Sequence, residues 1–333
     1  MDRREFLITI TAGAVLVLTA GAGEGVEVVK PIQSLKRGKK TRLSLIKTRD
    51  RATGIGRAVD LLATNSIQGK DVLLKPNFNT SDPFPASTHN DTLTHLILHL
   101  QKMGSKSITV GERCGPPDTA DVLKEKGIYG LCKGLGVRLI NFEELPAPDW
   151  VRIRPEQSHW LDGFDVARPV IESPCMVTTC CLKTHGYGGI FTMSLKLSVG
   201  TTHKGNMAEL HTSFMSMRKM IAEINQAYDP SLILLDGIDA FVDNGPARGP
   251  LKHADVILAG TDRIAIDAVG LSVLKELGSN KAIMEKKIFE QEQIERAVEL
   301  GLGVSRAEDI EILTDDAAGK EYAEKVMKIL LQG

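Results

Sequence analysis

Residues 71–113 read DVLLKPNFNTSDPFPASTHNDTLTHLILHLQKMGSKSITVGER, and this stretch decides the fold class. It begins with a short apolar run, Asp71 to Lys75, and ends with a second one, Ser107 to Gly111. Between the two runs, apolar residues recur at the spacing of one helix face, at Leu93, Ile97, Leu100 and Met103. A strand, a helix and a second strand in this order predict two parallel strands joined by a helical crossover.

The same alternation continues through the rest of the chain. The predicted strands are Arg42 to Thr48, Asp71 to Lys75, Ser107 to Gly111, Val137 to Phe142, Met176 to Lys183, Leu232 to Asp236, Asp255 to Ala259 and Ile310 to Leu313. Continuous apolar runs separated by helices favour a mostly parallel sheet covered by helices on both faces. We therefore predict an α/β fold, with one large domain over residues 42–333.

Three segments add detail to this prediction. Helical spacing over Met207, Leu210, Phe214, Met217, Ile221 and Ile224 predicts one helix. The tail from Ala317 to Leu331 predicts an amphipathic helix packed on the sheet. Residues 145–174 contain five prolines and predict an irregular insertion, which would be a hinge, an antiparallel excursion or a subdomain boundary.

The composition excludes several classes of protein. The chain has 333 residues, of which 42% are hydrophobic, so it can bury a sizeable core. Its 41 Lys and Arg nearly balance its 42 Asp and Glu, whereas a nucleic-acid-binding protein needs a basic excess or a concentrated basic face. The sequence therefore predicts a globular protein that does not bind nucleic acid.

The five cysteines indicate neither a disulfide scaffold nor a local metal cluster. No two of them form a C-x-x-C pair, so a ferredoxin-type iron-sulfur cluster is disfavoured. The adjacent Cys180 and Cys181 would point to opposite faces of one strand, which makes a shared role improbable. We interpret the cysteines as mostly buried structural thiols.

The first 22 residues resemble a bacterial twin-arginine signal. Arg3 and Arg4 precede Phe6 and Leu7, and an apolar stretch then runs to small residues at positions 20–22. The alternative is an uncleaved membrane anchor formed by residues 6–22. In both cases the twin-arginine export machinery is the expected partner, and the expected location is the periplasm or the outer face of the cytoplasmic membrane. Residues 23–41 are predicted to form a basic linker.

Polar residues follow the predicted strands at their carboxyl ends, where open α/β sheets bind ligands. They are Lys75 and Asn77, Glu112 and Arg113, Lys183 and His185, Asp236, and Thr261 and Asp262. Each has a simpler structural interpretation: a strand-end lysine is commonly a solvated charge, and Asp262 or Thr261 is predicted to cap the following helix. Several such ends together nevertheless predict a binding site.

Residues 180–211, CCLKTHGYGGIFTMSLKLSVGTTHKGNMAELH, are the richest in reactive side chains. Their glycines would expose backbone N–H groups that, with Lys183 and Lys196, would hold a phosphate or carboxylate. Neither a P-loop nor a G-x-G-x-x-G fingerprint is present, so a nicotinamide cofactor is disfavoured. Alternatively, a transition metal would be held by four residues from separate segments, namely His185, His203, His211 and Asp236.

The order of five motifs resembles the bacterial and archaeal domain-of-unknown-function family 362. The motifs are VLLKPN, LKTHG, SLKLSVG, LLDGI with NGPARGP, and VILAGTDRIAIDAVG, and together they cover about Leu43 to Leu313. The resemblance implies a shared site at Lys75, Asn77, Lys183, His185, Lys196, Asp236, Gly245 and Pro246. Leu197 stands where the family pattern often has Asn, which implies one polar contact fewer. Some members carry ferredoxin-like cysteines, which this chain lacks.

A looser likeness is to nickel-pincer lactate racemase. That enzyme has a Gly-Gly segment, a cofactor-bearing lysine and a downstream metal-binding histidine, and here Gly188-Gly189, Lys196 and His211 fall in a comparable order. We use this likeness as an analogy only.

Three functions therefore remain open from the sequence. The first is an exported α/β enzyme that binds a small anionic substrate or cofactor, with Lys75, Asn77, Lys196, Gly245 and Pro246 as binding residues. In it, Lys183, His185 and Asp236 would be catalytic, with His185 as the general acid or base. The second is a non-catalytic binding or maturation protein that carries a cofactor. The third is a metal-dependent isomerase or racemase.

Overall fold

The computed structural model describes residues 40–333, so the predicted signal and nearly all of the predicted linker lie outside the described residues. The strands are β1 (Thr41–Lys47), β2 (Asp71–Lys75), β3 (Ser107–Glu112), β4 (Arg138–Asn141), β5 (Trp150–Ile153), β6 (Phe164–Ala167), β7 (Cys175–His185), β8 (Ile190–Thr192), β9 (Pro230–Phe241), β10 (Leu251–Gly260) and β11 (Ile310–Leu313). The helices are α1 (Arg51–Leu61), α2 (Asn90–Lys102), α3 (Thr119–Glu125), α4 (Ile128–Gly134), α5 (Arg168–Glu172), α6 (Ser194–Leu197), α7 (Met207–Thr212), α8 (Met217–Ile224), α9 (Arg263–Leu277), α10 (Lys281–Met284), α11 (Glu292–Glu299) and α12 (Ala317–Gln332).

One nine-stranded sheet organises the domain in the order β11-β1-β10-β9-β7-β2-β3-β4, with β8 paired to β7. The pairs β11-β1, β9-β7, β7-β2, β2-β3 and β3-β4 are parallel. The pairs of β10 with β1 and β9, and of β8 with β7, are antiparallel. The prediction of a mostly parallel sheet in an α/β fold is confirmed.

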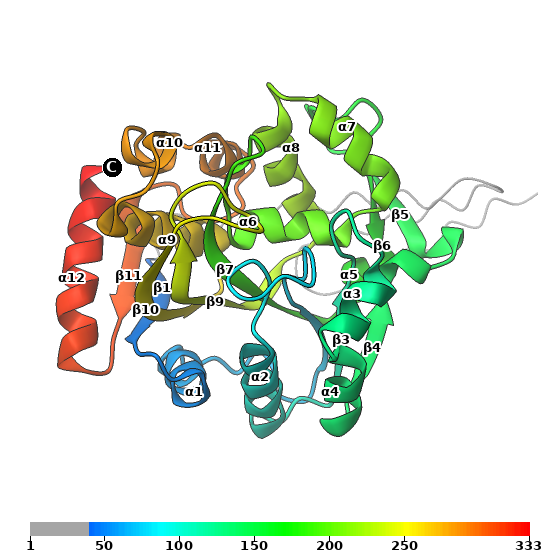
Figure 1. Cartoon of the computed structure of the whole chain (residues 1–333), viewed down its shortest axis with the longest axis horizontal. Coiled ribbons are helices and arrows are strands. Elements are labelled where there is room, and N and C mark those ends of the chain that lie inside the picture. Colours follow the sequence, from blue (N-terminus) through cyan, green and yellow to red (C-terminus); the bar gives the residue numbers. More distant parts are fainter. Residues whose placement is uncertain (1–39) are drawn as a thin grey trace, which may run out of the picture.

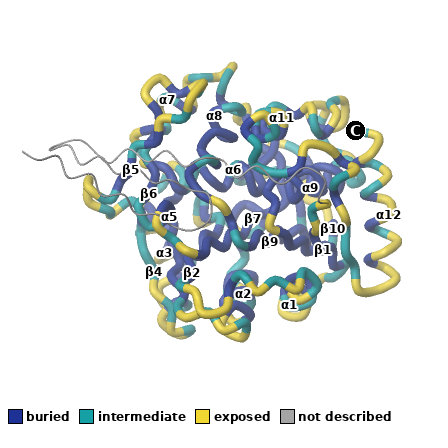
Figure 2. The backbone as a smooth tube through the Cα atoms, turned by 180° about the vertical axis from the view of Figure 1, so that it is seen from behind, coloured by how far each residue is buried: buried dark blue, intermediate teal, exposed yellow. Residues whose placement is uncertain are grey.

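Helices cover both faces of this sheet, as predicted. Figure 1 shows α1, α2 and α4 on one face, and α6, α8, α9 and α11 on the other. Each side has its own apolar core: one packs α1 and α2 against the strands, and another surrounds α9. Helix α9 is buried from Arg263 to Leu274, and the central strands are equally buried (Figure 2).

Among residues 40–333, no helix is both long and apolar enough to cross a membrane.

The predicted irregular segment, residues 145–174, is an antiparallel excursion. Strands β5 and β6 form a separate two-stranded sheet, and α5 then leads the chain back into β7. The side chains of Trp150 and Phe164 pack into a third apolar core together with Met220 and Ile221 of α8.

Two predictions about element boundaries are wrong. The helix predicted across residues 207–224 is interrupted, because α7 ends at Thr212 and α8 begins at Met217, which leaves Phe214 and Met215 exposed. Strand β9 continues five residues beyond Asp236, so Asp236 lies within the strand and not at its end. The tail helix and the cap of α9 by Asp262 are confirmed.

Candidate functional site

A pocket open to solvent lies at the carboxyl ends of β2, β3 and β7. It is lined by Lys75, Asn77, Phe78, Asn79, Glu112, Arg113, Cys114, Gly115, Lys183, Thr192, Lys196, Leu197, Val199, Gly200 and Pro246. The structure therefore brings together five of the predicted site residues, namely Lys75, Asn77, Lys183, Lys196 and Pro246. Four basic side chains and one acidic side chain line the pocket, which gives it a positive balance of charge.

Lys75 and Glu112 form a buried ion pair at the base of the pocket. Each side chain is 1% exposed. Glu112 also accepts hydrogen bonds from the backbone N–H groups of Phe78, at 2.8 Å, and Arg113, at 2.9 Å. Burial raises the pKa of Glu112 and lowers the pKa of Lys75, because each loses its hydration. The charge of Lys75 is thus engaged with Glu112.

Lys183 lies near the end of β7 and is fully buried. Its ammonium group donates to the carbonyl oxygen of Ala86, and burial lowers its pKa. A neutral carbonyl does not balance a positive charge, and no carboxylate pairs with Lys183 among the described residues. The remaining donor capacity of this ammonium group is therefore free for a ligand in the pocket.

Lys196 extends from the short helix α6, which is held by a buried carboxylate. Asp267 of α9 accepts hydrogen bonds from the backbone N–H groups of Ser194, at 2.7 Å, and Leu195, at 2.9 Å. Within residues 40–333, the Lys196 amine has no hydrogen-bond or ion-pair partner. Burial, together with nearby Lys183 and Arg113, lowers the pKa of Lys196 to about 7. Lys196 is therefore partly neutral at physiological pH.

Arg113 holds the segment that follows α6. Its guanidinium group donates to the carbonyl oxygen of Cys114 at 2.8 Å and to the carbonyl oxygen of Val199. Its side chain is 2% exposed, and burial lowers its pKa. Two of its nitrogen atoms donate to backbone carbonyls, so Arg113 shapes the wall of the pocket and adds positive potential. Its Nε atom is buried without a partner among the described residues.

Two buried acceptors in the pocket wall have no partner. Asn77 Oδ1 and Thr192 Oγ1 are shielded from water and make no hydrogen bond to the described residues. Buried polar atoms are almost always hydrogen-bonded in native proteins. Unpaired atoms in the wall of a pocket are therefore consistent with a ligand that satisfies them.

The predicted site residues Gly245 and Pro246 lie in the loop after β9. The carbonyl oxygen of Gly245 accepts a hydrogen bond from the backbone N–H of Gly186 at 3.2 Å, and Pro246 lines the pocket. A Cβ atom at Gly245 would lie 2.1 Å from the carbonyl oxygen of Thr184. Only glycine permits this close approach, which places Pro246 at the end of β7.

His185 lies beside the pocket as a neutral imidazole. It is 8% exposed, and its Nδ1 atom is buried without a partner in the described part of the chain. Burial, with Lys196 and Lys183 nearby, lowers its pKa to about 2. His185 was predicted to be a general acid or base. The acid role does not fit this environment, because an imidazole with so low a pKa is not protonated near pH 7, and the base role stays a prediction.

The four residues predicted to bind a metal do not form one cluster in the described part of the chain, and that prediction is wrong for this set. His203 Nδ1 accepts from the backbone N–H of Gly205, and its ring packs edge-on against Trp150. His211 is exposed and contacts the carbonyl oxygen of Met207. Among residues 40–333, no group of three or more His, Cys, Asp or Glu side chains is arranged to hold a metal ion.

Asp236, predicted to be catalytic, is a buried structural carboxylate. It accepts from Arg51 Nε at 2.8 Å and from Thr92 Oγ1 at 2.5 Å, so it ties β9 to the first residues of α1 and α2. It does not line the pocket. A polar residue within a strand is tolerated when its charge is paired in this way.

The sequence analysis assigned no specific role to Glu112, Arg113, Thr192 or Asp267. The first two were visible as charges after a predicted strand, but their partners were not. Thr192 and Asp267 carried no signal, because nothing in the sequence shows that α9 passes beneath α6. The five cysteines are buried and free, which confirms the prediction of buried thiols.

These features define an α/β protein with a lysine-rich pocket at the carboxyl ends of parallel strands. The chain belongs to the family described as domain of unknown function (DUF362), whose model matches residues 72–272. Among solved structures, the lactate racemase apoprotein from Thermoanaerobacterium thermosaccharolyticum is similar, with a TM-score of 0.45 and 11% sequence identity over 95% of this chain and 91% of that chain. A search of curated proteins finds no match.

Proposed function

We propose that the protein binds a small anion, a carboxylate or a phosphate group, between Lys183 and Lys196. The single observation that carries this proposal is the Lys196 amine, which faces other cationic groups in the pocket and has no partner among residues 40–333. Lys75 is already paired with Glu112, so its contribution is structural. An anion would relieve the repulsion between Lys183 and Lys196 and complete their hydrogen bonds.

Lys196 is also the group best suited to exchange a proton with the bound anion. A group with a pKa near the working pH is an efficient acid or base, and the pKa of Lys196 is about 7. We therefore assign to Lys196 the role of general acid or base that was first predicted for His185. The neutral His185 imidazole would act as a hydrogen-bonding neighbour.

Replacing Lys183 with methionine should weaken anion binding at least about tenfold, because a hydrogen bond to a charged group contributes about 1.5–3 kcal/mol. The measurement is isothermal titration with inorganic phosphate, acetate and oxalate at low ionic strength. Methionine retains the length and most of the volume of lysine, so it fills the same buried space without the charge.

The matched control is Lys328→Met, which makes the same change in charge at an exposed position on α12. It should leave the affinity of every anion unchanged. Equal affinity in Lys183→Met and wild type would contradict the proposal, and so would a failure of all three anions to bind the wild-type protein.

We further propose that residues 1–22 direct export through the twin-arginine pathway, on the basis of the Arg3-Arg4 motif. Changing both arginines to lysine keeps the charge but removes the motif, so the protein should accumulate in the cytoplasm. Cell fractionation of a bacterial host with this pathway measures the distribution. The control is Lys39→Gln/Lys40→Gln, which alters two basic residues outside the motif and should be exported normally. Normal export of the arginine variant would overturn this proposal.

A further inference from the structure

We propose that Lys196 forms a covalent imine with the carbonyl carbon of its ligand, a small aldehyde or ketone that also carries a carboxylate or phosphate group. This inference rests on the proposed anion binding and adds the substrate class and the reacting atom. It follows from the different surroundings of the three pocket lysines.

Only one of these three amines is free to act as a nucleophile. The Lys75 ammonium is paired with Glu112 and also donates to the carbonyl oxygen of Pro76 at 2.8 Å. The Lys183 ammonium donates to Ala86. Lys196 alone among them has no partner within the described residues, so its lone pair is not withheld by an ion pair when the amine is neutral.

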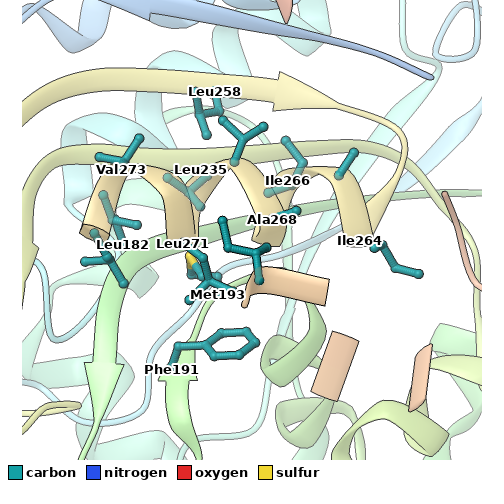
Figure 3. Close-up of a cluster of buried hydrophobic side chains, with 14 of the residues drawn as sticks. Leu182, Phe191, Met193, Leu235, Leu258, Ile264, Ile266, Ala268, Leu271 and Val273 are labelled. Atoms are coloured by element: carbon teal, nitrogen blue, oxygen red, sulfur yellow. The ribbon is translucent and has the colours of Figure 1, made fainter. Parts of the chain in front are cut away.

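The backbone that carries Lys196 is fixed from two sides. Asp267 holds the N–H groups at the start of α6, and Asn225 Nδ2 donates to the carbonyl oxygen of Leu195 at 2.9 Å. Just before α6, Met193 packs with Leu271 and Ala268 of α9 in the apolar core (Figure 3). The backbone that carries Lys196 is thus held against the buried helix α9.

The space beside Lys196 is also restricted. A Cβ atom at Gly189 would lie 3.1 Å from Lys196 Cε and 2.9 Å from His185 Nδ1. Glycine at this position leaves room for both side chains, and a larger residue would displace the lysine. A rigid base and a confined side chain orient a nucleophile toward a bound reactant.

The neighbouring positive charges favour the neutral, nucleophilic form of Lys196. Lys183 and Arg113 lie close enough to disfavour a further positive charge, and burial acts in the same direction. Desolvation next to another cationic group is a recognised means of activating a lysine for attack on a carbonyl group. The same cations would hold the anionic group of the ligand.

The reaction balances without any further reactant. The Lys196 lone pair attacks the carbonyl carbon, and the electrons of the C=O π bond move to oxygen, which receives the proton lost by the nitrogen. The nitrogen lone pair of the resulting carbinolamine then forms the C=N bond and expels the hydroxyl group, which takes up the second proton of the nitrogen and leaves as water. One of the unpaired acceptors in the pocket wall, Asn77 Oδ1 or Thr192 Oγ1, would accept the hydrogen bond of the carbinolamine hydroxyl.

The test is reductive trapping of the full-length protein with cyanoborohydride. The protein is incubated separately with pyruvate, which carries a carboxylate, and with glyceraldehyde 3-phosphate, which carries a phosphate. Intact mass and peptide mapping then locate the adduct. We expect one stable adduct per chain, located on Lys196. Inorganic phosphate or acetate should slow the reaction by competing for the same pocket.

Lys196→Arg is the matched variant, because it keeps a positive charge but has no nucleophilic amine. It should show no adduct above the background at exposed lysines such as Lys328. Because mapping of the wild-type protein locates the adduct directly, the test does not depend on how well this variant folds.

Each remaining outcome contradicts the inference. If the anions bind and depend on Lys183, but neither probe labels Lys196, then imine formation is wrong while anion binding stands. If labelling is spread equally over exposed lysines, Lys196 has no special reactivity. If neither anions nor probes bind, the proposed function itself fails.

Discussion

Replacing Lys196 with methionine is expected to stabilise the protein by about 2 kcal/mol at pH 7 while it abolishes anion binding. The folded pKa of Lys196 is about 7, whereas the ordinary value is 10.5. The folded state therefore binds fewer protons than the unfolded state between these two values, so the stability of the wild type rises with pH in this window. The loss of folding stability caused by burying Lys196 is therefore largest below pH 7 and disappears above about pH 10.5.

The size of the stabilisation expected for Lys196→Met follows from the shift in the pKa of Lys196. One pKa unit corresponds to about 1.4 kcal/mol, so the full shift sets an upper limit of about 5 kcal/mol. The side chain is partly exposed, and solvent screening reduces this value to about 2 kcal/mol. Methionine loses no interaction in return, because Lys196 has no partner in residues 40–333. A functional site that costs stability in this way is common in proteins.

Urea unfolding from pH 6 to pH 10.5 measures this prediction directly. The difference between Lys196→Met and wild type should be largest at pH 6 and shrink toward zero at pH 10.5. Lys328→Met should show no comparable pH dependence. A variant that is less stable than wild type at pH 6 would show that Lys196 makes a stabilising contact.

Replacing Glu112 with glutamine is expected to destabilise the protein by about 3–5 kcal/mol. The change leaves Lys75 buried without a countercharge, and breaking a buried pair by removing one partner typically has this cost. It also replaces one of the carboxylate oxygens that accept the N–H groups of Phe78 and Arg113 with a donor.

The double variant Lys75→Met/Glu112→Gln separates the charge from the other contacts. With Lys75 removed, no unpaired charge remains, so the double variant should recover at least half of the stability lost by Glu112→Gln. Equilibrium denaturation of wild type, both single variants and the double variant gives the coupling energy. Additive effects of the two single changes would show that Lys75 and Glu112 do not stabilise each other.

The strands were predictable because strands buried on both faces read as continuous apolar runs. Asp71–Lys75 is such a strand and matches the predicted bounds. The edge strand Ile310–Leu313 also matches them, although only Ile310 is buried. The error at Asp236 arose because a charged residue was taken to mark a strand end. Arg51 and Thr92 neutralise and satisfy this carboxylate inside the fold, and neither partner is recognisable from a sequence.

The prediction of one continuous helix from Met207 to Ile224 was wrong for a related reason. Apolar periodicity records which residues are hydrophobic, and it does not record whether a partner surface exists to bury them. Phe214 continues the pattern but is 71% exposed, and the neighbouring Met215 is 85% exposed, because the chain leaves the helical path between α7 and α8.

The grouping of Lys75, Lys183 and Lys196 was predictable in part, since the carboxyl ends of parallel strands meet at one edge of the sheet. Their different roles were not predictable. Whether a lysine is paired depends on the register that sets Glu112 beside Lys75 and on the path of α9 beneath α6. The same limit applies to the four dispersed metal-ligand candidates, whose spacing is compatible with a site that the fold does not assemble.

The position of β1 in the sheet has a consequence for biosynthesis. This first strand lies between β10 and β11, which are among the last strands to be synthesised. During synthesis, both edges of β1 therefore remain unpaired until most of the chain has been made. The pairing of β1 with β10 and β11 also joins residues that are far apart in the sequence, and such pairing forms slowly. If the leader directs transport of folded cargo, a truncated product would present an unpaired β1 after the leader and linker, and we expect the export machinery to reject it as unfolded.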